Sequence, residues 1–295
     1  MNDSVLTSVL LPVALAIIML GLGLTLTVAD FTRVLRMPRA VLVALGTQVL
    51  LLPVICFGLV KLFDLAPALA VGMMLLAASP GGTTANLFSH LAGGDVALNV
   101  TLTAVNSVLA VITLPIVVNL SLAYFLGDGQ IGLQPLKMLQ VFAIVLIPVA
   151  LGMLLRNKQP AFAERMVRPV KLGSILVLAL VIFAAVYTER DNVLDYLAAV
   201  GVVAVLLNVL SLALGYAVPR LARLGERQAI ACSMEIGIHN ATLALTIALS
   251  PSLLDNSEIA IPVAVYGIVM FVPTAAFAYY LSHRPTALRP KNLEV

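Results

Sequence analysis

Long apolar segments recur along the whole chain, and they limit the folds that it can adopt. Of its 295 residues, 61% are hydrophobic and only 11% are charged, whereas a soluble domain has about 25% charged residues. A helix of about 20 apolar residues is long enough to cross a bilayer. We therefore expect an all-α polytopic membrane protein with about nine transmembrane helices, at residues 5–28, 39–62, 66–93, 96–126, 135–155, 170–187, 194–217, 228–250 and 258–282.

The basic residues are distributed unevenly between the connections. Fourteen of the 17 Lys and Arg residues fall in odd-numbered connections or in the tail at 283–295, and three fall on the opposite side. Because short cytoplasmic loops are enriched in Lys and Arg, this bias places the N-terminus outside and the C-terminus in the cytoplasm. It predicts a multi-pass protein of a bacterial inner membrane, surrounded by lipid.

Two of the apolar segments are interrupted by polar and glycine-rich sequence. The third contains SPGGTTAN at Ser79–Asn86, where Pro80 removes a backbone donor, and the eighth contains GIHN at 237–240. The two segments are five apart and run in opposite directions across the membrane. This spacing predicts an inverted repeat with halves at 1–126 and 135–282, a linker at 127–134 and a cytoplasmic tail at 283–295.

One acidic side chain, Glu235, lies inside an apolar span, whereas the other 13 acidic residues fall in loops, termini or segment ends. An ionised carboxylate at the centre of a bilayer costs at least about 2.5–3.5 kcal/mol, so Glu235 needs a partner. A structural Glu that ties helices together is one interpretation. A cation ligand or proton carrier is the other, and the adjacent break favours it, since freed carbonyls and a carboxylate suit a hard cation such as Na⁺.

Further polar residues lie within the predicted spans. Asn99, Thr103 and Asn106 share one helix face, and together with Gln48 they are candidate ligands. Asn208 and Ser211 are more typical of interhelical hydrogen bonds. His239 fits a buried structural histidine and a functional one equally well.

These stretches resemble a known family. SPGGTTANLFSHLAGGDVALNVTLTAVNS and EIGIHNATLA are similar to signature stretches of the bile acid:sodium symporter family, and GLGLTL at Gly21–Leu26 also fits. The resemblance covers nearly the whole chain. It implies a nine-helix member whose two broken helices cross within a core domain formed by segments 2–4 and 7–9. Segments 1, 5 and 6 would form a flatter panel domain.

The resemblance also implies ligands for one or two sodium ions and for a substrate. The first sodium site would use Asn86, Asn99, Thr103 and Glu235, with the carbonyl of Ala85. The second would use Gln48, Glu235, the carbonyls of Ile236 and Ile238, and His239, where the family has Gln. Since hard cations prefer oxygen, His239 would weaken the second site or couple transport to protons. Substrate contacts would come from Gly82, Thr83, Thr84 and Asn240.

Together these features predict a secondary transporter and no catalytic residues. The expected activity is sodium-coupled symport of an organic anion, a small carboxylate or a bile-acid-like molecule, by alternating access. We expect a monomer that binds no nucleic acid. Proton-coupled or weakly sodium-coupled transport, a passive channel and an intramembrane enzyme are the alternatives. The enzyme is disfavoured because GGD at Gly93–Asp95 has no second membrane Asp and no HExxH motif occurs.

Overall fold

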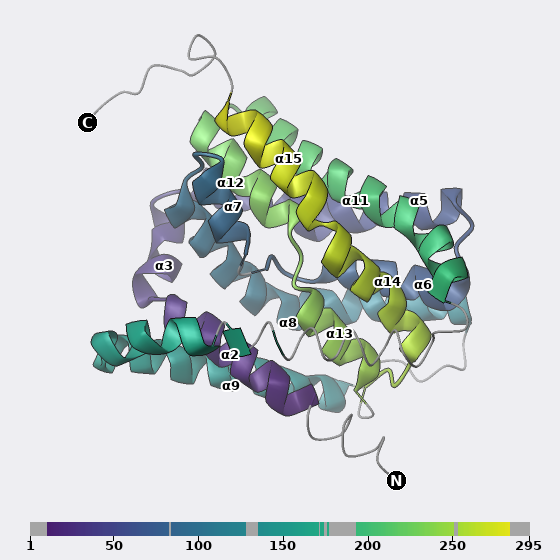
Figure 1. Cartoon of the computed structure of the whole chain (residues 1–295), viewed down its shortest axis with the longest axis horizontal. Coiled ribbons are helices and arrows are strands. Elements are labelled where there is room, and N and C mark those ends of the chain that lie inside the picture. Colours follow the sequence, from purple (N-terminus) through teal and green to yellow (C-terminus); the bar gives the residue numbers. More distant parts are fainter. Residues whose placement is uncertain are drawn as a thin grey trace.

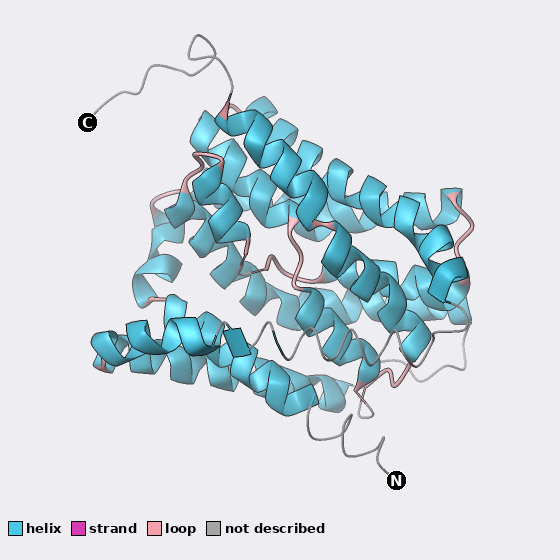
Figure 2. Ribbon diagram, viewed as in Figure 1, coloured by secondary structure: helices cyan, strands magenta, loops and turns pink. Residues whose placement is uncertain are grey.

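The computed structural model describes residues 11–82, 84–127, 135–170, 172–173, 176, 193–250 and 253–283. Within these ranges the elements are helices, joined by short loops and one isolated backbone bridge (Figure 2). Four of the described helices are long and apolar enough to cross a membrane, or five when one bent pair is counted as a span. An all-α polytopic membrane protein is thus confirmed. The count of nine spans stays a prediction, because most of 170–187 lies outside the described residues.

The first half of the chain contains one long continuous span, two spans with internal irregularities and one broken span. α4, η3 and α5 follow one another without a gap from Pro38 to Leu62, and η3 is a single π-helical turn within that span. The elements are α2 (Leu11–Thr25), α3 (Val28–Thr32), η2 (Arg33–Leu35), α4 (Pro38–Gly46), η3 (Thr47–Leu51), α5 (Leu52–Leu62), α6 (Pro67–Ala78), α7 (Ala85–Leu91) and α8 (Val96–Leu126).

The second half contains a second broken span, at residues 226–249. A helical stretch at 160–170 follows α9, in the basic region after the fifth predicted segment. The predicted linker lies almost wholly outside the described residues, as does the tail after residue 283. The elements are α9 (Pro135–Lys158), α11 (Val193–Leu221), α12 (Glu226–Gly237), α13 (Ala241–Leu249), α14 (Ser257–Val269) and α15 (Phe271–Ser282).

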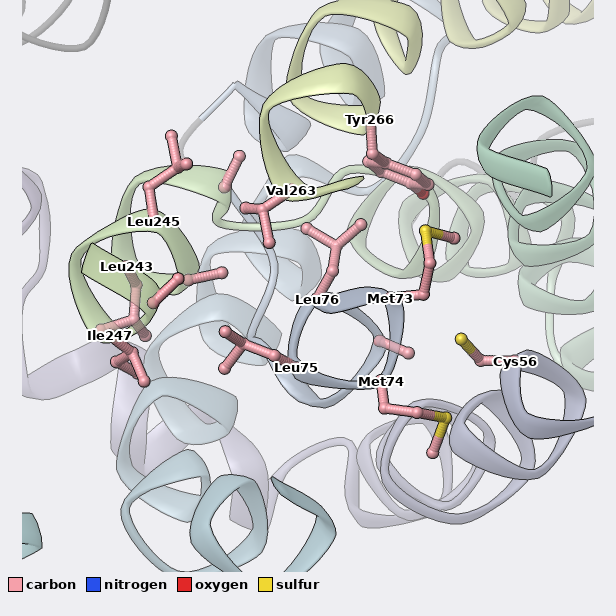
Figure 3. Close-up of a cluster of buried hydrophobic side chains, with 14 of the residues drawn as sticks. Cys56, Met73, Met74, Leu75, Leu76, Leu243, Leu245, Ile247, Val263 and Tyr266 are labelled. Carbon is pink, nitrogen blue, oxygen red and sulfur yellow. The ribbon is translucent and has the colours of Figure 1, made fainter. Parts of the chain in front are cut away.

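The hydrophobic core surrounds α6, which is apolar on all sides. Such a helix is expected to be buried on all sides, and α6 packs against α5, α8, α13 and α14. Figure 3 shows Leu75 and Leu76 of α6 next to side chains of α13 and α14, with Tyr266 at one end of the cluster. Tyr266 is fully buried. The first broken span therefore enters the centre of the bundle through its apolar half-helix.

α2 and α9 form a layer of their own along one side of the bundle (Figure 1). Glycines allow the two backbones to approach closely. A Cβ on Gly23 would lie 2.2 Å from the carbonyl oxygen of Val149, and one on Gly152 would lie 2.5 Å from that of Leu20. These helices are two of the three predicted panel helices. The third, at 170–187, lies mostly outside the described residues, so the division into panel and core stays a prediction.

Candidate functional site

The two broken helices meet in the middle of the molecule. α6 ends at Ala78 and α7 begins at Ala85, while α12 ends at Gly237 and α13 begins at Ala241. Figure 2 shows the two connecting loops next to each other, surrounded by helices. The breaks fall where Pro80 and the GIHN sequence predicted them.

Backbone hydrogen bonds join the two loops in an antiparallel arrangement. The N–H of Gly82 donates to the carbonyl of Ile238 at 2.7 Å, and the N–H of Asn240 donates to the carbonyl of Pro80 at 2.8 Å. These bonds form the isolated bridge between residues 81 and 239. Polar backbone within a membrane must be satisfied inside the protein, and each break here supplies partners for the other.

Glu235 lies beside this crossing with only 1% of its surface exposed. The hydroxyl of Thr103, on α8, donates to its Oε2 at 2.6 Å. The N–H of Gly81 faces the carboxylate, but Oε1 completes no hydrogen bond of ordinary geometry. A Cβ on Gly81 would lie 2.1 Å from Oε1, so only glycine lets the first loop pack this closely on the acid. Among the described residues, no basic side chain pairs with Glu235.

Two more buried acceptor oxygens lack a donor among the described residues, and they belong to helices that pack against the helix of Glu235. Asn99 precedes Thr103 by one helical turn and donates its amide to the carbonyl of Ala231 at 2.8 Å, which leaves Oδ1 as an unpaired acceptor. Oδ1 of Asn86, at the start of α7, is likewise buried and unpaired in the described part of the chain. α7 and α8 both pack against α12. Buried oxygens that lack donors, around a carboxylate, fit a hard cation.

Ala85 is fully buried next to Asn86. Its N–H donates to the carbonyl of Gly82 at 3.0 Å, which closes the turn into α7. Its methyl group brings no side-chain oxygen, so only its carbonyl could serve as a ligand.

The residues predicted for a second cation are placed differently. The carbonyl of Ile238 already accepts from Gly82. The carbonyl of Ile236 is released from the helix ladder, because the N–H of Asn240 goes to Pro80. Gln48 is buried in η3, and its Nε2 has no partner among the described residues. In the part of the chain that the structure describes, no hydrogen bond joins Gln48 to Glu235.

His239 is buried against Tyr266, with ring centroids 5.3 Å apart in an edge-to-face arrangement. Its Nδ1 lies 3.4 Å from the carbonyl oxygen of Ser79. A carbonyl only accepts, so this contact assigns the proton of the neutral ring to Nδ1. Nε2 then has a lone pair and no partner within the described residues. The ring presents nitrogen at a position where a cation would prefer oxygen.

The end of α12 is held by a hydrogen-bond cluster that the sequence did not reveal. The amide of Asn208 donates to the carbonyl of Gly237 at 2.7 Å, and the hydroxyl of Tyr266 donates to the same carbonyl at 3.0 Å. The predicted interhelical role of Asn208 is thus confirmed. Ser211 donates to Leu207 of its own helix. Tyr266 is hard to find from sequence, since a tyrosine in an apolar span usually indicates packing.

Of the predicted substrate residues, Gly82 and Asn240 lie at the crossing. Asn240 caps α13, with its Oδ1 accepting from the N–H of Leu243 at 3.1 Å. This leaves its side-chain NH₂ as a donor. Thr84 precedes α7 and is partly exposed. Thr83 lies outside the described residues. Asn106 continues the stripe of Asn99 and Thr103, but it buries an unpaired NH₂, a donor that does not suit a cation.

Comparison with known proteins shows which family this chain is similar to. A model of the sodium bile acid symporter family matches residues 12–196. A probable chloroplastic sodium/metabolite cotransporter of Oryza sativa subsp. japonica is 29% identical over 96% of this chain and 66% of its own length. An uncharacterized sodium-dependent transporter of Bacillus subtilis is 28% identical over 79% of this chain and 72% of its own.

Sodium/bile acid cotransporter 4 of Homo sapiens is 32% identical over 79% of this chain, which spans 54% of the human protein. The matched family region begins in α2 and contains the first break, with Asn86, Asn99 and Thr103. These relatives are transporters, so the expectation of a transporter rather than an enzyme is confirmed. The chain belongs to the sodium bile acid symporter family.

Proposed function

We propose that this protein is a secondary transporter that carries a small organic anion into the cell together with Na⁺, by alternating access. One observation carries the proposal: Asn86, Asn99 and Glu235 each bury an oxygen that has no donor among the described residues, and their helices α7, α8 and α12 pack against one another beside the crossing of the two broken helices. The sodium-dependent relatives support the coupling ion. The distribution of basic residues supports an outside N-terminus and a cytoplasmic C-terminus.

Na⁺ is a transported substrate in this proposal, and Asn86, Asn99, Thr103 and Glu235 would hold it. Glu235 supplies the negative charge, which is otherwise costly within a membrane. Because Glu235 packs against Gly81, a charge balanced there also stabilises the first loop against the second. The first loop continues directly to the proposed substrate residues. Na⁺ and the anion would thus favour the same closed crossing, which is the basis of coupling.

We propose that one sodium ion, rather than two, accompanies each anion. Around the second predicted site, the Ile238 carbonyl is already hydrogen-bonded and His239 presents a ring nitrogen. A hard cation that leaves water needs several oxygen ligands. The first site has three side-chain oxygens without a donor among the described residues, whereas in the second site one carbonyl is engaged and an imidazole nitrogen stands in place of an amide oxygen.

The anionic substrate is supported by the start of α13. Helix N-termini carry partial positive charge and unpaired N–H groups, which favour a carboxylate. Asn240 lies at this end with its side-chain NH₂ still available. Small carboxylates are proposed ahead of bile-acid-like anions because the relative matched over 96% of this chain is named a sodium/metabolite cotransporter. One copy of the chain contains both loops, so a monomer suffices for the site.

Proton coupling is the second candidate, and the unpaired Nε2 of His239 favours it. The two candidates differ in what drives uptake. Uptake into proteoliposomes that requires Na⁺ and ignores an imposed proton gradient would exclude the proton-coupled alternative. Uptake driven by a proton gradient in the absence of Na⁺ would exclude sodium symport.

The most direct test is thermal unfolding of the detergent-solubilised protein with a panel of small carboxylates, in NaCl and in KCl of equal ionic strength. A ligand that binds only the folded state raises its stability according to concentration and affinity. We expect one class of carboxylate to stabilise the protein in NaCl and not in KCl. Equal stabilisation in both salts would contradict sodium coupling. Concentrative uptake of that carboxylate would then separate a symporter from a passive channel.

A further inference from the structure

A sharp bend separates the α2–α9 layer from the rest of the molecule. α2 packs along α9, and the chain then turns by 71° between the segments Ala16–Thr25 and Val28–Leu35. After the bend, α3 packs against α8 instead. One continuous stretch of chain therefore contacts two different parts of the protein, on either side of the bend.

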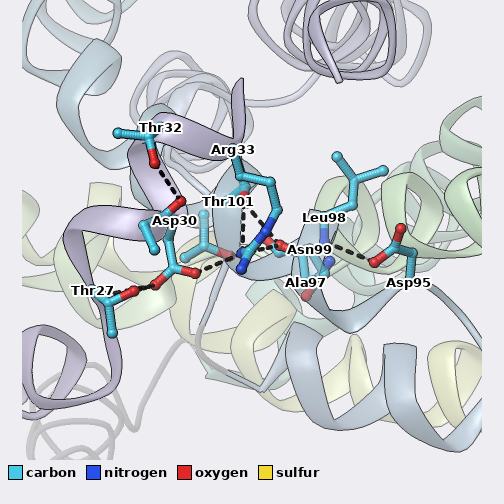
Figure 4. A network of polar contacts seen from close by, with 11 residues as sticks. Thr27, Asp30, Thr32, Arg33, Asp95, Ala97, Leu98, Asn99 and Thr101 are labelled. Carbon is cyan, nitrogen blue, oxygen red and sulfur yellow. Dashed lines mark hydrogen bonds and ion pairs between the residues drawn. The ribbon is translucent and has the colours of Figure 1, made fainter. Parts of the chain in front are cut away.

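The bend is held by a cluster around Asp30, which is 6% exposed (Figure 4). The backbone N–H and the hydroxyl of Thr27 both donate to Oδ2 of Asp30 at 2.7 Å. Nη1 of Arg33 pairs with Oδ1 at 2.7 Å. Each carboxylate oxygen thus has a partner, in contrast to Glu235. A buried charge with matched donors holds a defined geometry.

The same guanidinium nitrogen reaches across to the first turns of α8. Nη1 of Arg33 lies 3.2 Å from the carbonyl oxygen of Ala97 and 3.4 Å from Oγ1 of Thr101. Figure 4 shows Arg33 between Asp30 and these two residues. Asn99 lies between them in sequence and pairs with Ala231 of α12 on its other side. This turn of α8 is held by Arg33 from one direction and by α12 from the other.

We propose that Arg33 is a positioning residue for the sodium site, acting through the first turns of α8. It ties the bend after α2 to the helix segment that carries Asn99 and Thr103. The orientation of two proposed sodium ligands then depends on where the α2–α9 layer holds the bend. This inference rests on the proposed function, but it adds a residue that the sequence marked only as a cytoplasmic topology signal.

The test measures sodium binding separately from transport. Arg33→Met keeps an unbranched stem of similar length and removes the guanidinium. We expect it to raise the NaCl concentration that gives half-maximal thermal stabilisation by about tenfold, at the low end of what loss of a supporting partner costs a metal site. The carboxylate concentration that gives half-maximal thermal stabilisation in saturating NaCl should change little.

Two variants control for charge and for folding. Arg36→Met removes the same charge three residues further along, at an exposed position whose side chain makes no hydrogen bond or ion pair with the described residues. It should bind sodium like the unaltered protein. Arg33→Lys keeps the charge but lacks the fork geometry of guanidinium, so it should recover part of the lost affinity, and it remains informative where Arg33→Met does not fold.

The outcomes distinguish failure of the positioning role of Arg33 from failure of the proposed function. Arg33→Met and Arg33→Lys with unchanged half-maximal NaCl would overturn the positioning role, even where maximal uptake falls. An equal shift in Arg36→Met would also overturn it, because general surface charge would then explain the effect. Absence of any sodium response in the unaltered protein would contradict the proposed function itself.

Discussion

The two sides of the end of α12 differ in how their polar groups are satisfied. On one side, here termed the open side, Asn86, Asn99 and Glu235 each bury an oxygen that has no donor within the described residues. On the other, termed the capped side, Asn208 and Tyr266 both donate to the carbonyl of Gly237. On the proposed function, the groups of the capped side are structural and the unpaired oxygens of the open side are cation ligands.

The contrast has an energetic meaning. A buried polar group without a partner costs about 1–3 kcal/mol, so the open side lowers stability unless a ligand supplies what is missing. The capped side contributes stability with or without a ligand. If Na⁺ binds as proposed, the capped side would hold the acceptors of the open side in position for it.

The strongest test of the open side is Glu235→Gln, which keeps the shape of the side chain and removes its charge. We expect sodium affinity to fall by about 100-fold, because removing one charge of a buried pair costs several kcal/mol. Sodium-dependent uptake at a fixed NaCl concentration would then be lost. Glu258→Gln, at the start of α14 and outside the site, is the control. Normal uptake by correctly inserted Glu235→Gln would refute the open side as the cation site.

Gly81→Ala tests whether the close contact between the first loop and the acid matters. The added methyl group would lie 2.3 Å from Cδ of Glu235, so the carboxylate must move. We expect half-maximal NaCl for thermal stabilisation to rise by about tenfold, comparable to loss of a supporting contact at a metal site. Gly58→Ala is the matched control, since nothing lies within 4 Å of its added atom. Identical sodium titrations for both variants would argue against this packing role.

Tyr266→Phe tests the capped side. The substitution removes one of the two donors to the Gly237 carbonyl while the aromatic ring stays. The protein should lose about 1 kcal/mol of stability, the typical net value of one hydrogen bond, with little change in sodium affinity. Thermal unfolding in detergent measures the loss of stability, and NaCl titration measures the sodium affinity. A large sodium defect with unchanged stability would mean that the capped side also belongs to the cation site.

His239→Gln tests whether the residue at position 239 limits the protein to one sodium ion. An amide oxygen at this position suits a hard cation better than an imidazole nitrogen, so we expect the Hill slope for sodium to rise from about one to about two. His239→Asn, whose amide is one methylene shorter, is the control. A slope near two in the unaltered protein would show that two ions already bind there.

Several features were predictable from residues near one another in sequence. Long apolar runs determined the helical membrane class, because backbone polar groups within a bilayer must pair inside their own segment. Pro80 and the GIHN sequence located both helix breaks, since these residues weaken the local hydrogen-bond ladder. Glu235 stood out because a lone acid in an apolar span is costly.

Other features depended on contacts between distant parts of the chain. Composition and periodicity do not reveal which acceptors of the site lack a donor, which carbonyl is capped by Asn208 and Tyr266, or which turn of α8 Arg33 contacts. Hydrogen-bond partners 29 to 132 residues apart decide each of the first two, and the bend after α2 decides the third. Sequence alone determined where polar groups enter the membrane. Only the tertiary structure decided which are satisfied there, because hydrogen bonding depends on distance and direction in space.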